Sequence, residues 1–239
     1  MSFSNVHFIL FKPQLSENIG ACARALKNFK FSNLKVVSPK VSFPNDKIIA
    51  TSVGAKDIIK STKVYNDFKD SIKEFNYIIA TTNRRRNKNY KYLEINQLNK
   101  IDFKKKVAIV FGPESSGLSN NEISYANCAL QIPTNPNFKS LNLSHSVIII
   151  CQILSSILKS KKTKYSRSKK VKTASKHEIQ SMVNFCVSKL ERLNFFKPKE
   201  KKPIMLENLK SIFYKIDLSK KEIRILTSVF AALYKKKVD

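Results

Sequence analysis

The stretch VAIVFGPESSGLSNNEISYANCALQIPTNPNFKSLNLSHSVIIICQIL, residues 107–154, decides the fold. Two short apolar runs in it, 107–111 and 129–132, each stop abruptly at a polar loop. Such runs are typical of strands that are buried on both faces of a sheet. Parallel α/β sheets bind ligands outside the carboxyl ends of their strands, so both loops are candidates for a ligand site.

Glycine is scarce in this chain, and its placement carries information. Of only four glycines, Gly112 and Gly117 both fall in the loop after the first apolar run. Glycine admits positive φ and close approach of backbones. We therefore expect this loop to need glycine for its shape; ordinary turn chemistry is the alternative reading of either residue.

Outward from this stretch, apolar runs and helical patterns alternate along the chain. Strands are predicted at 6–11, 34–37, 64–65 and 77–81. Helices are predicted at 21–29, at 46–59 with a break at Gly54-Ala55, and at 67–75, with a short helix or turn at 96–100. This alternation up to about residue 158 predicts an α/β fold with a mostly parallel, covered sheet. The chain has neither G-x-G-x-x-G nor G-x-x-x-x-G-K-[ST], which excludes the dinucleotide fingerprint and the P-loop.

The composition changes after residue 158. Residues 159–175 are rich in Lys and lack apolar periodicity, so a flexible basic linker is predicted, with a frayed helix end as the alternative. Amphipathic helices are predicted at 177–193, 204–213 and 220–234. The predicted organisation is therefore a domain at 1–158, a linker at 159–175 and a helical extension at 176–239. An extension of this size needs docking or a partner for stability.

Charge is the strongest signal in the composition. Lys and Arg number 45 against 17 Asp and Glu, a formal net charge of +28. Such an excess favours a polyanionic partner, nucleic acid first and an anionic membrane surface second. Coding bias toward lysine is the alternative, but it does not explain the scarcity of acidic residues. No apolar run approaches the length of a membrane span, and the N-terminus lacks the features of a secretory signal.

Other classes of site find little support in the sequence. The four cysteines are scattered, which fits neither a zinc site nor a disulfide framework and favours buried thiols in a reducing cytoplasm. No metal-ligand or nucleophile motif is present.

Two groups of arginines favour a phosphate or another anion as a ligand. A third strand, 77–81, ends at a polar loop that carries Arg84, Arg85 and Arg86, and the arginine side chain suits phosphate. Arg24 near the start of a helix opposes the helix dipole, which favours a nearby anion.

Three motifs together resemble a known family. Residues 18–28 (NIGACARALKN) resemble the first motif of the TrmH-type branch of the SPOUT RNA methyltransferases. Residues 110–118 (VFGPESSGL) resemble the second, and Ile132-Pro133 with residues 140–144 (SLNLS) resemble the third. The basic linker and helical extension are similar to those of the TrmJ subgroup, tRNA 2′-O-methyltransferases that act at position 32 of the anticodon loop.

The resemblance implies properties that the residue pattern alone does not give. It implies a SPOUT-type parallel sheet with a C-terminal trefoil knot and S-adenosyl-L-methionine as the cofactor. It also implies a cytoplasmic homodimer that acts on tRNA, with its sites at the dimer interface and with neither metal nor membrane involved.

The resemblance also implies roles for individual residues. The catalytic residues would be Arg24, Ser140 and Asn142. The cofactor would be bound by Thr81, Thr82, Asn83, Gly112, Ile132, Ser140 and Leu141. RNA would be bound by Asn18, Arg84 and Arg86, and Glu114 would bridge to the partner subunit. Because arginine is a poor base, orienting the ribose hydroxyl and holding the adjacent phosphate is the easier physical role for Arg24.

The chain departs from the family pattern at three places. Asn83 and Lys139 stand where the subgroup usually has small residues, and both would border the cofactor. The loop 14–17 differs from the more usual Pro-Gly and could affect substrate choice. The leading hypothesis is a tRNA 2′-O-methyltransferase. A ribosomal RNA methyltransferase and a non-catalytic RNA-binding protein on the same scaffold are the alternatives.

Overall fold

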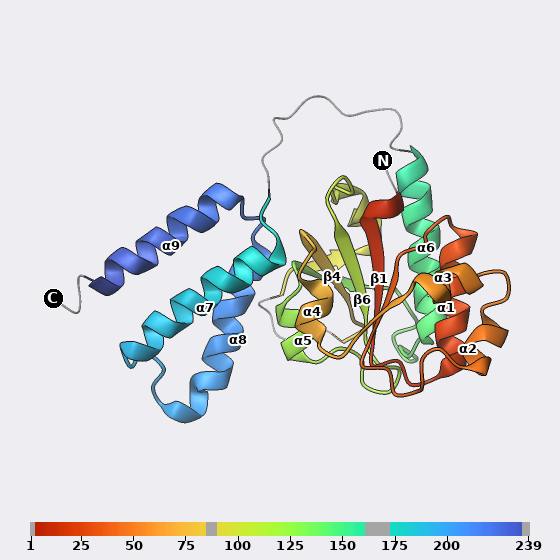
Figure 1. Ribbon diagram of the computed structural model, residues 1–239, viewed down its shortest axis with the longest axis horizontal. Helices are drawn as coiled ribbons and strands as arrows, with labels where there is room; N and C mark the ends of the chain where they lie inside the picture. Colours follow the sequence, from red (N-terminus) through yellow and green to blue (C-terminus); the bar gives the residue numbers. More distant parts are fainter. Residues whose placement is uncertain (1–2, 85–89, 161–172, 236–239) are drawn as a thin grey trace.

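The computed structural model describes residues 3–84, 90–160 and 173–235. Seven strands form one sheet in the order β3-β2-β1-β6-β4-β7-β5, and every pairing in it is parallel. The strands are β1 (Val6–Phe11), β2 (Leu34–Val37), β3 (Lys63–Tyr65), β4 (Tyr77–Thr81), β5 (Tyr92–Glu94), β6 (Val107–Phe111) and β7 (Cys128–Gln131). Helices cover both faces of the sheet (Figure 1), which confirms the predicted α/β class.

The centre of the sheet is β6, which lies between β1 and β4. Val107 is in register with both Val6 and Tyr77, so the three strands run side by side in one direction. All five residues of β6 are buried, which explains its uninterrupted apolar sequence. The carboxyl ends of β4, β6 and β7 consequently meet at one edge of the sheet.

One face of the sheet is covered by α1 (Ser16–Asn28), α2 (Asp46–Thr51), α3 (Lys56–Ser61) and α6 (Leu143–Ser160). Small residues let these helices pack closely, and Gly20 of α1 is the extreme case. A Cβ at Gly20 would lie 2.0 Å from Thr51 Oγ1 and 2.6 Å from the Ile48 carbonyl oxygen. The predicted break near residue 54 is confirmed, because α2 and α3 are separate helices.

The opposite face is covered by α4 (Phe68–Ile72) and α5 (Asn120–Ser124), and the helical extension completes it. Ile179, Met182 and Val183 of α7 (Lys176–Arg192) share an apolar core with the sheet, as does Tyr214 of α8 (Lys202–Lys215). The last helix, α9 (Lys220–Lys235), packs on α7 and has no buried residue. The extension is therefore docked on the sheet.

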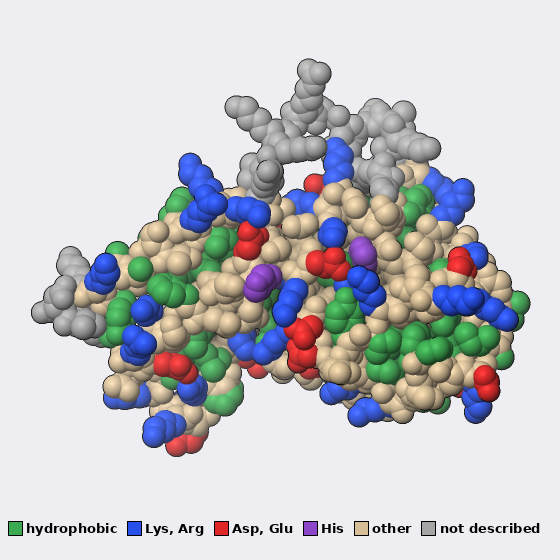
Figure 2. Space-filling view, viewed as in Figure 1, with side chains coloured by type: hydrophobic (Ala, Val, Ile, Leu, Met, Phe, Trp, Pro, Cys, Tyr) green, Lys and Arg blue, Asp and Glu red, His purple; other side chains and the backbone are tan. Residues whose placement is uncertain are grey.

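The remaining elements are short 3-10 helices at Phe3–Asn5, Ile95–Lys100 and Lys199–Lys201. Strand β5 was not predicted, because its three residues give no measurable apolar period. The trefoil knot stays a prediction. Among the described residues, no helix is long and apolar enough to cross a membrane. Figure 2 shows Lys and Arg side chains spread over both the sheet domain and the extension, with few acidic side chains between them.

Lys176 is a buried lysine where the extension meets the sheet. The residue is 2% exposed, and its Nζ donates to the Tyr214 carbonyl oxygen (3.1 Å). Its backbone N–H donates to the Phe75 carbonyl oxygen (3.0 Å). Burial lowers the pKa of Lys176 to about 7, opposed by the charge of Asp217.

This buried lysine predicts a pH-dependent stability difference. The folded pKa is below the unfolded value of 10.5, so the unfolded state binds more protons between about pH 7 and pH 10.5. The contribution of Lys176 to the free energy of unfolding should therefore rise as the pH is raised from about 7 to about 10.5. Relative to Lys176→Met, the wild type should gain up to about 2 kcal/mol from pH 7 to pH 9, measured by urea unfolding. If the difference in unfolding free energy between the wild type and Lys176→Met does not vary with pH, the lowered pKa of Lys176 is wrong.

Candidate functional site

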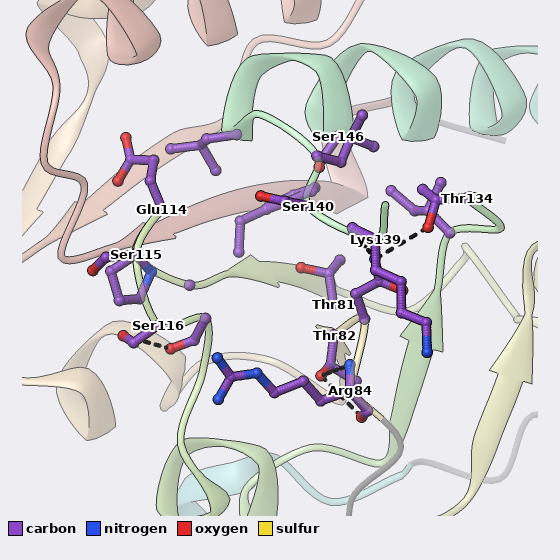
Figure 3. A pocket seen from close by; sticks show the side chains of 18 of the residues that line it. Thr81, Thr82, Arg84, Glu114, Ser115, Ser116, Thr134, Lys139, Ser140 and Ser146 are labelled. Carbon is purple, nitrogen blue, oxygen red and sulfur yellow. Dashed lines mark hydrogen bonds between the residues drawn. The ribbon is translucent and has the colours of Figure 1, made fainter. Parts of the chain in front are cut away.

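A cavity of about 400 Å³ lies at the carboxyl ends of β4, β6 and β7. Three loops line it, namely those that follow these strands (Figure 3). All seven residues predicted to bind the cofactor line this cavity: Thr81, Thr82, Asn83, Gly112, Ile132, Ser140 and Leu141. Arg84 and Glu114 line it as well. The structure thus brings together residues up to 60 positions apart because three parallel strands end at one edge.

Gly112 is required by the shape of the loop that it opens. A Cβ at this position would lie 2.3 Å from the Leu118 backbone nitrogen and 2.5 Å from the Gly117 carbonyl carbon. The loop 112–118 folds back onto its own start, helped by Gly117 at φ +66° and by a Gly117 N–H bond to the Pro113 carbonyl oxygen (2.8 Å). The backbone that Gly112 meets is therefore that of its own loop.

A chain of hydrogen bonds joins the three motifs. Asn18 Nδ2 donates to Glu114 Oε1 (2.8 Å), and Asn142 Nδ2 donates to Asn18 Oδ1 (3.0 Å). Asn142 Oδ1 in turn accepts the Ser144 backbone N–H (2.8 Å) at the start of α6. Asn18 is buried, Glu114 is half-buried and Asn142 is exposed. This chain fixes the orientation of both amides, since each must donate on one side and accept on the other.

The charges around the cavity are unevenly placed. The carboxylate of Glu114 lies on one side and Lys139 lies on the opposite side, as Figure 3 shows. Arg84 extends along the rim toward Ser116 (Figure 3). A ligand in the cavity therefore meets the Glu114 carboxylate and Lys139 on opposite sides, and the Arg84 guanidinium at the rim near Ser116.

Residues 5–152 match the SpoU rRNA Methylase family, which covers more than half of the chain. The chain belongs to the SpoU methylase family. It is 30% identical over 237 residues to the tRNA (cytidine-2′-O-)-methyltransferase TrmJ of Methanocaldococcus jannaschii, with 94% of this chain and 98% of that protein covered. The SPOUT, TrmH-type resemblance of the motifs is thereby confirmed.

Solved structures give the same assignment for the fold. The crystal structure of TrmJ from Z. mobilis ZM4 superposes with a TM-score of 0.84 at 27% identity, with 95% of this chain and 98% of that chain covered. The SpoU methyltransferase AviRb from Streptomyces viridochromogenes, solved in complex with the cofactor AdoMet, superposes with a TM-score of 0.53 at 16% identity. The superposition covers 66% of this chain and 62% of the AviRb chain. At 16% identity this similarity supports the fold alone.

The first SpoU motif is only partly assembled in one chain. Asn18 reaches the cavity loops through Glu114 and Asn142, but Arg24 does not line the cavity. Arg24 is exposed on α1, and its side chain makes no hydrogen bond or ion pair among the described residues. Arg86 lies outside the described residues. Within those residues no group of three potential metal ligands occurs.

Several residues that line the SpoU site were not singled out from the sequence. They are Phe111, Pro113, Ser115, Ser116, Leu130, Thr134, Leu143 and Ser146. Five of them lie inside a motif and the other three lie within two positions of one, so giving roles to whole motifs and their immediate neighbours would have found them. Gln14 contacts the loop after β6 from 100 positions away, and no local pattern signals that contact.

Asn83 and Lys139, two departures from the subgroup pattern, contact each other. Asn83 Nδ2 donates to the Lys139 carbonyl oxygen and to Thr134 Oγ1 (3.2 Å). Asn83 Oδ1 accepts from Gln131 Nε2 (3.3 Å). One side chain therefore ties the end of β4 to the end of β7 and to both ends of the loop 134–139.

Replacing Asn83 by alanine should loosen this loop and weaken cofactor binding. Loss of these hydrogen bonds, each worth about 1 kcal/mol, predicts a dissociation constant for S-adenosyl-L-methionine raised by about tenfold. Calorimetric titration measures it, with Asn184→Ala on α7 as the control. An unchanged affinity in Asn83→Ala would show that the loop holds its position without this side chain.

Proposed function

We propose that the protein is an S-adenosyl-L-methionine-dependent tRNA ribose 2′-O-methyltransferase that modifies cytidine or uridine at position 32 of the anticodon loop. The observation that carries the proposal is that the second and third motifs of a methylase family line one cavity, and that Asn18 of the first motif is hydrogen-bonded to Glu114 and Asn142 of those motifs. The TrmJ names of relatives aligned over nearly the whole chain favour tRNA as the substrate.

The cavity suits this cofactor in size and in lining. Its volume of about 400 Å³ falls within the usual range for small-molecule sites. Ile132 and Leu141 offer apolar side chains and main-chain groups to an adenine ring, while Thr81, Thr82 and Ser140 offer hydroxyls. When bound, the cofactor supplies a methyl group on a sulfonium, so the protein needs neither a metal nor a covalent nucleophile.

The residues of the chain then have to position and deprotonate a ribose hydroxyl. Ser140 and Asn142 stand beside the target ribose, with Asn142 held rigid by Asn18 and by the first turn of α6. Arg84 lies at the rim, where it holds a phosphate, and we assign Arg86 to the same strand of RNA. The net charge of +28 adds a salt-dependent attraction for the whole polyanion.

The proposal includes a cytoplasmic homodimer in which the partner subunit completes each site. Arg24 is exposed and absent from the cavity of its own chain, so it is free to serve the cavity of a second copy. Large apolar side chains lie exposed beside the cavity loops: Leu15 is 51% exposed, Phe138 72% and Ile148 39%. A second copy placed over them would bury this surface and bring Glu114 close to the interface.

Methyl transfer from labelled S-adenosyl-L-methionine to unmodified bulk tRNA tests the proposal. Nucleoside analysis should give 2′-O-methylcytidine or 2′-O-methyluridine, and mapping should place it in the anticodon loop. Transfer to ribosomal RNA alone would keep the reaction and change the substrate. Transfer to neither would favour a non-catalytic RNA-binding protein on this scaffold.

A further inference from the structure

Gln14 lies in the loop between β1 and α1, outside every motif, and it is hydrogen-bonded to the loop that follows β6. Its backbone N–H donates to Glu114 Oε2 (2.9 Å), and its side-chain Oε1 accepts the Ser115 backbone N–H (3.1 Å). Because Ser115 N–H can only donate, the oxygen of the Gln14 amide must face it. The two bonds run in opposite directions between the same two segments.

The segment that carries Gln14 is itself firmly anchored. Lys12 N–H donates to the Val37 carbonyl oxygen (2.8 Å), and Lys40 N–H donates to the Pro13 carbonyl oxygen (3.0 Å). Pro13 is buried, and β1 pairs with both β2 and β6. Gln14 is therefore a fixed point from which the loop 113–117 can be held.

The loop 113–117 has few other supports. Pro113, Glu114, Ser115, Ser116 and Gly117 all line the cavity, and Ser115 and Ser116 are exposed. Apart from the internal Gly117 to Pro113 bond, the tertiary hydrogen bonds that hold this loop come from Gln14 and Asn18 within the described residues. Asn18 holds only the Glu114 side chain, so the Gln14 side chain is the support of the backbone at Ser115.

We infer that Gln14 is a positioning residue for the cofactor: it sets the wall of the cavity formed by residues 113–117. The inference rests on the proposed function, in which S-adenosyl-L-methionine occupies this cavity. It also gives the loop 14–17 a role different from substrate choice, since the contacts of Gln14 run to the cofactor wall. Gln14 is also connected to Asn142 by hydrogen bonds, since Gln14 bonds to Glu114, Glu114 to Asn18 and Asn18 to Asn142.

Gln14→Met tests this inference, because methionine has nearly the same length and volume but offers no comparable acceptor. Loss of one hydrogen bond to a backbone N–H should raise the dissociation constant for S-adenosyl-L-methionine by about fivefold, measured by calorimetry without RNA. The dissociation constant for tRNA and the midpoint of thermal unfolding should stay close to the wild-type values. Gln152→Met, an exposed glutamine on α6, is the matched control and should change neither affinity.

Three outcomes would overturn the inference. The first is an unchanged affinity for S-adenosyl-L-methionine. The second is a loss of tRNA affinity alone, which would mean that the loop 14–17 acts in substrate choice. The third is a fall in cofactor affinity, tRNA affinity and unfolding midpoint together, which would mean that Gln14 has a merely structural role. The proposed function fails separately: a wild-type protein that binds the cofactor but methylates no tRNA contradicts that function and leaves the Gln14 measurement valid.

Discussion

Arg24→Ala is expected to lower the rate of methyl transfer to tRNA by at least about a hundredfold, the scale of loss expected when a reacting hydroxyl is no longer held in position. Cofactor affinity should be unchanged, because the role assigned to Arg24 is to meet the ribose hydroxyl and the adjacent phosphate of the RNA and not the cofactor. Most of the tRNA affinity should also remain, since the chain carries 45 basic residues. Single-turnover methylation at saturating tRNA separates the chemical step from binding.

Lys27→Ala is the matched control for the charge removed from α1. Lys27 is exposed on the same helix and pairs with Asp57 (2.7 Å) at the surface. Its loss should leave the rate within about twofold, as expected for a surface ion pair. Normal methylation by Arg24→Ala would show that the catalytic role given to Arg24 is wrong.

Mixing two impaired variants tests whether Arg24 acts across subunits, at a cofactor concentration too low to saturate the weakened cavity. In a mixture of Arg24→Ala with Gly112→Ala, some dimers contain one intact cavity faced by one intact Arg24. Activity should then return to a sizeable fraction of the wild-type rate. A mixture that stays inactive, with exchange of subunits verified, would place Arg24 and the cavity in the same chain.

Gly112→Ala is expected to have the second largest effect. The added Cβ would lie 2.3 Å from a backbone nitrogen and 2.5 Å from a backbone carbon, so the loop 112–118 must shift. Overpacking of this kind costs about 1–3 kcal/mol of folding stability. Because the same loop forms one wall of the cavity, the affinity for S-adenosyl-L-methionine should fall by more than about tenfold.

Gly54→Ala provides the control for this second prediction. Gly54 has φ +74° but no atom within 4 Å of its would-be Cβ, so alanine there is strained without meeting a neighbour. It should cost about 1 kcal/mol of stability and leave the cofactor affinity unchanged. If both variants bind the cofactor normally, the cavity wall tolerates movement at Gly112.

Much of the fold was predictable, because the central strands are buried on both faces. The runs at 6–11, 34–37, 77–81 and 107–111 match β1, β2, β4 and β6 residue for residue. Strand β7 was shifted by one position, since an apolar run does not mark which residue makes the first ladder bond. The order of the strands could not be read from periodicity, because it depends on long-range pairing.

The candidate site divides in the same way. Loops that follow predicted strands were located, because parallel strands bring their carboxyl ends to one edge. The contact between Asn83 and Lys139 spans 56 positions, and that between Gln14 and Ser115 spans 101. Such pairs depend on how loops fold over one another, which no local pattern records. The position of Arg24 outside the cavity could not be predicted either. A motif match assigns a role to a residue but does not tell whether the residue acts in its own chain or in the partner subunit.

The insertion of β6 between β1 and β4 has a consequence for how the chain matures. During synthesis β1, β2 and β4 leave the ribosome first, yet β4 can join the sheet only through β6, thirty residues later. The edge of β1 that will receive β6 stays open until then, and parallel pairings of this range form slowly. A nascent chain that stalls before residue 107 would therefore expose two unpaired apolar edges. We expect this interval, rather than the finished protein, to be the period when it depends most on chaperones.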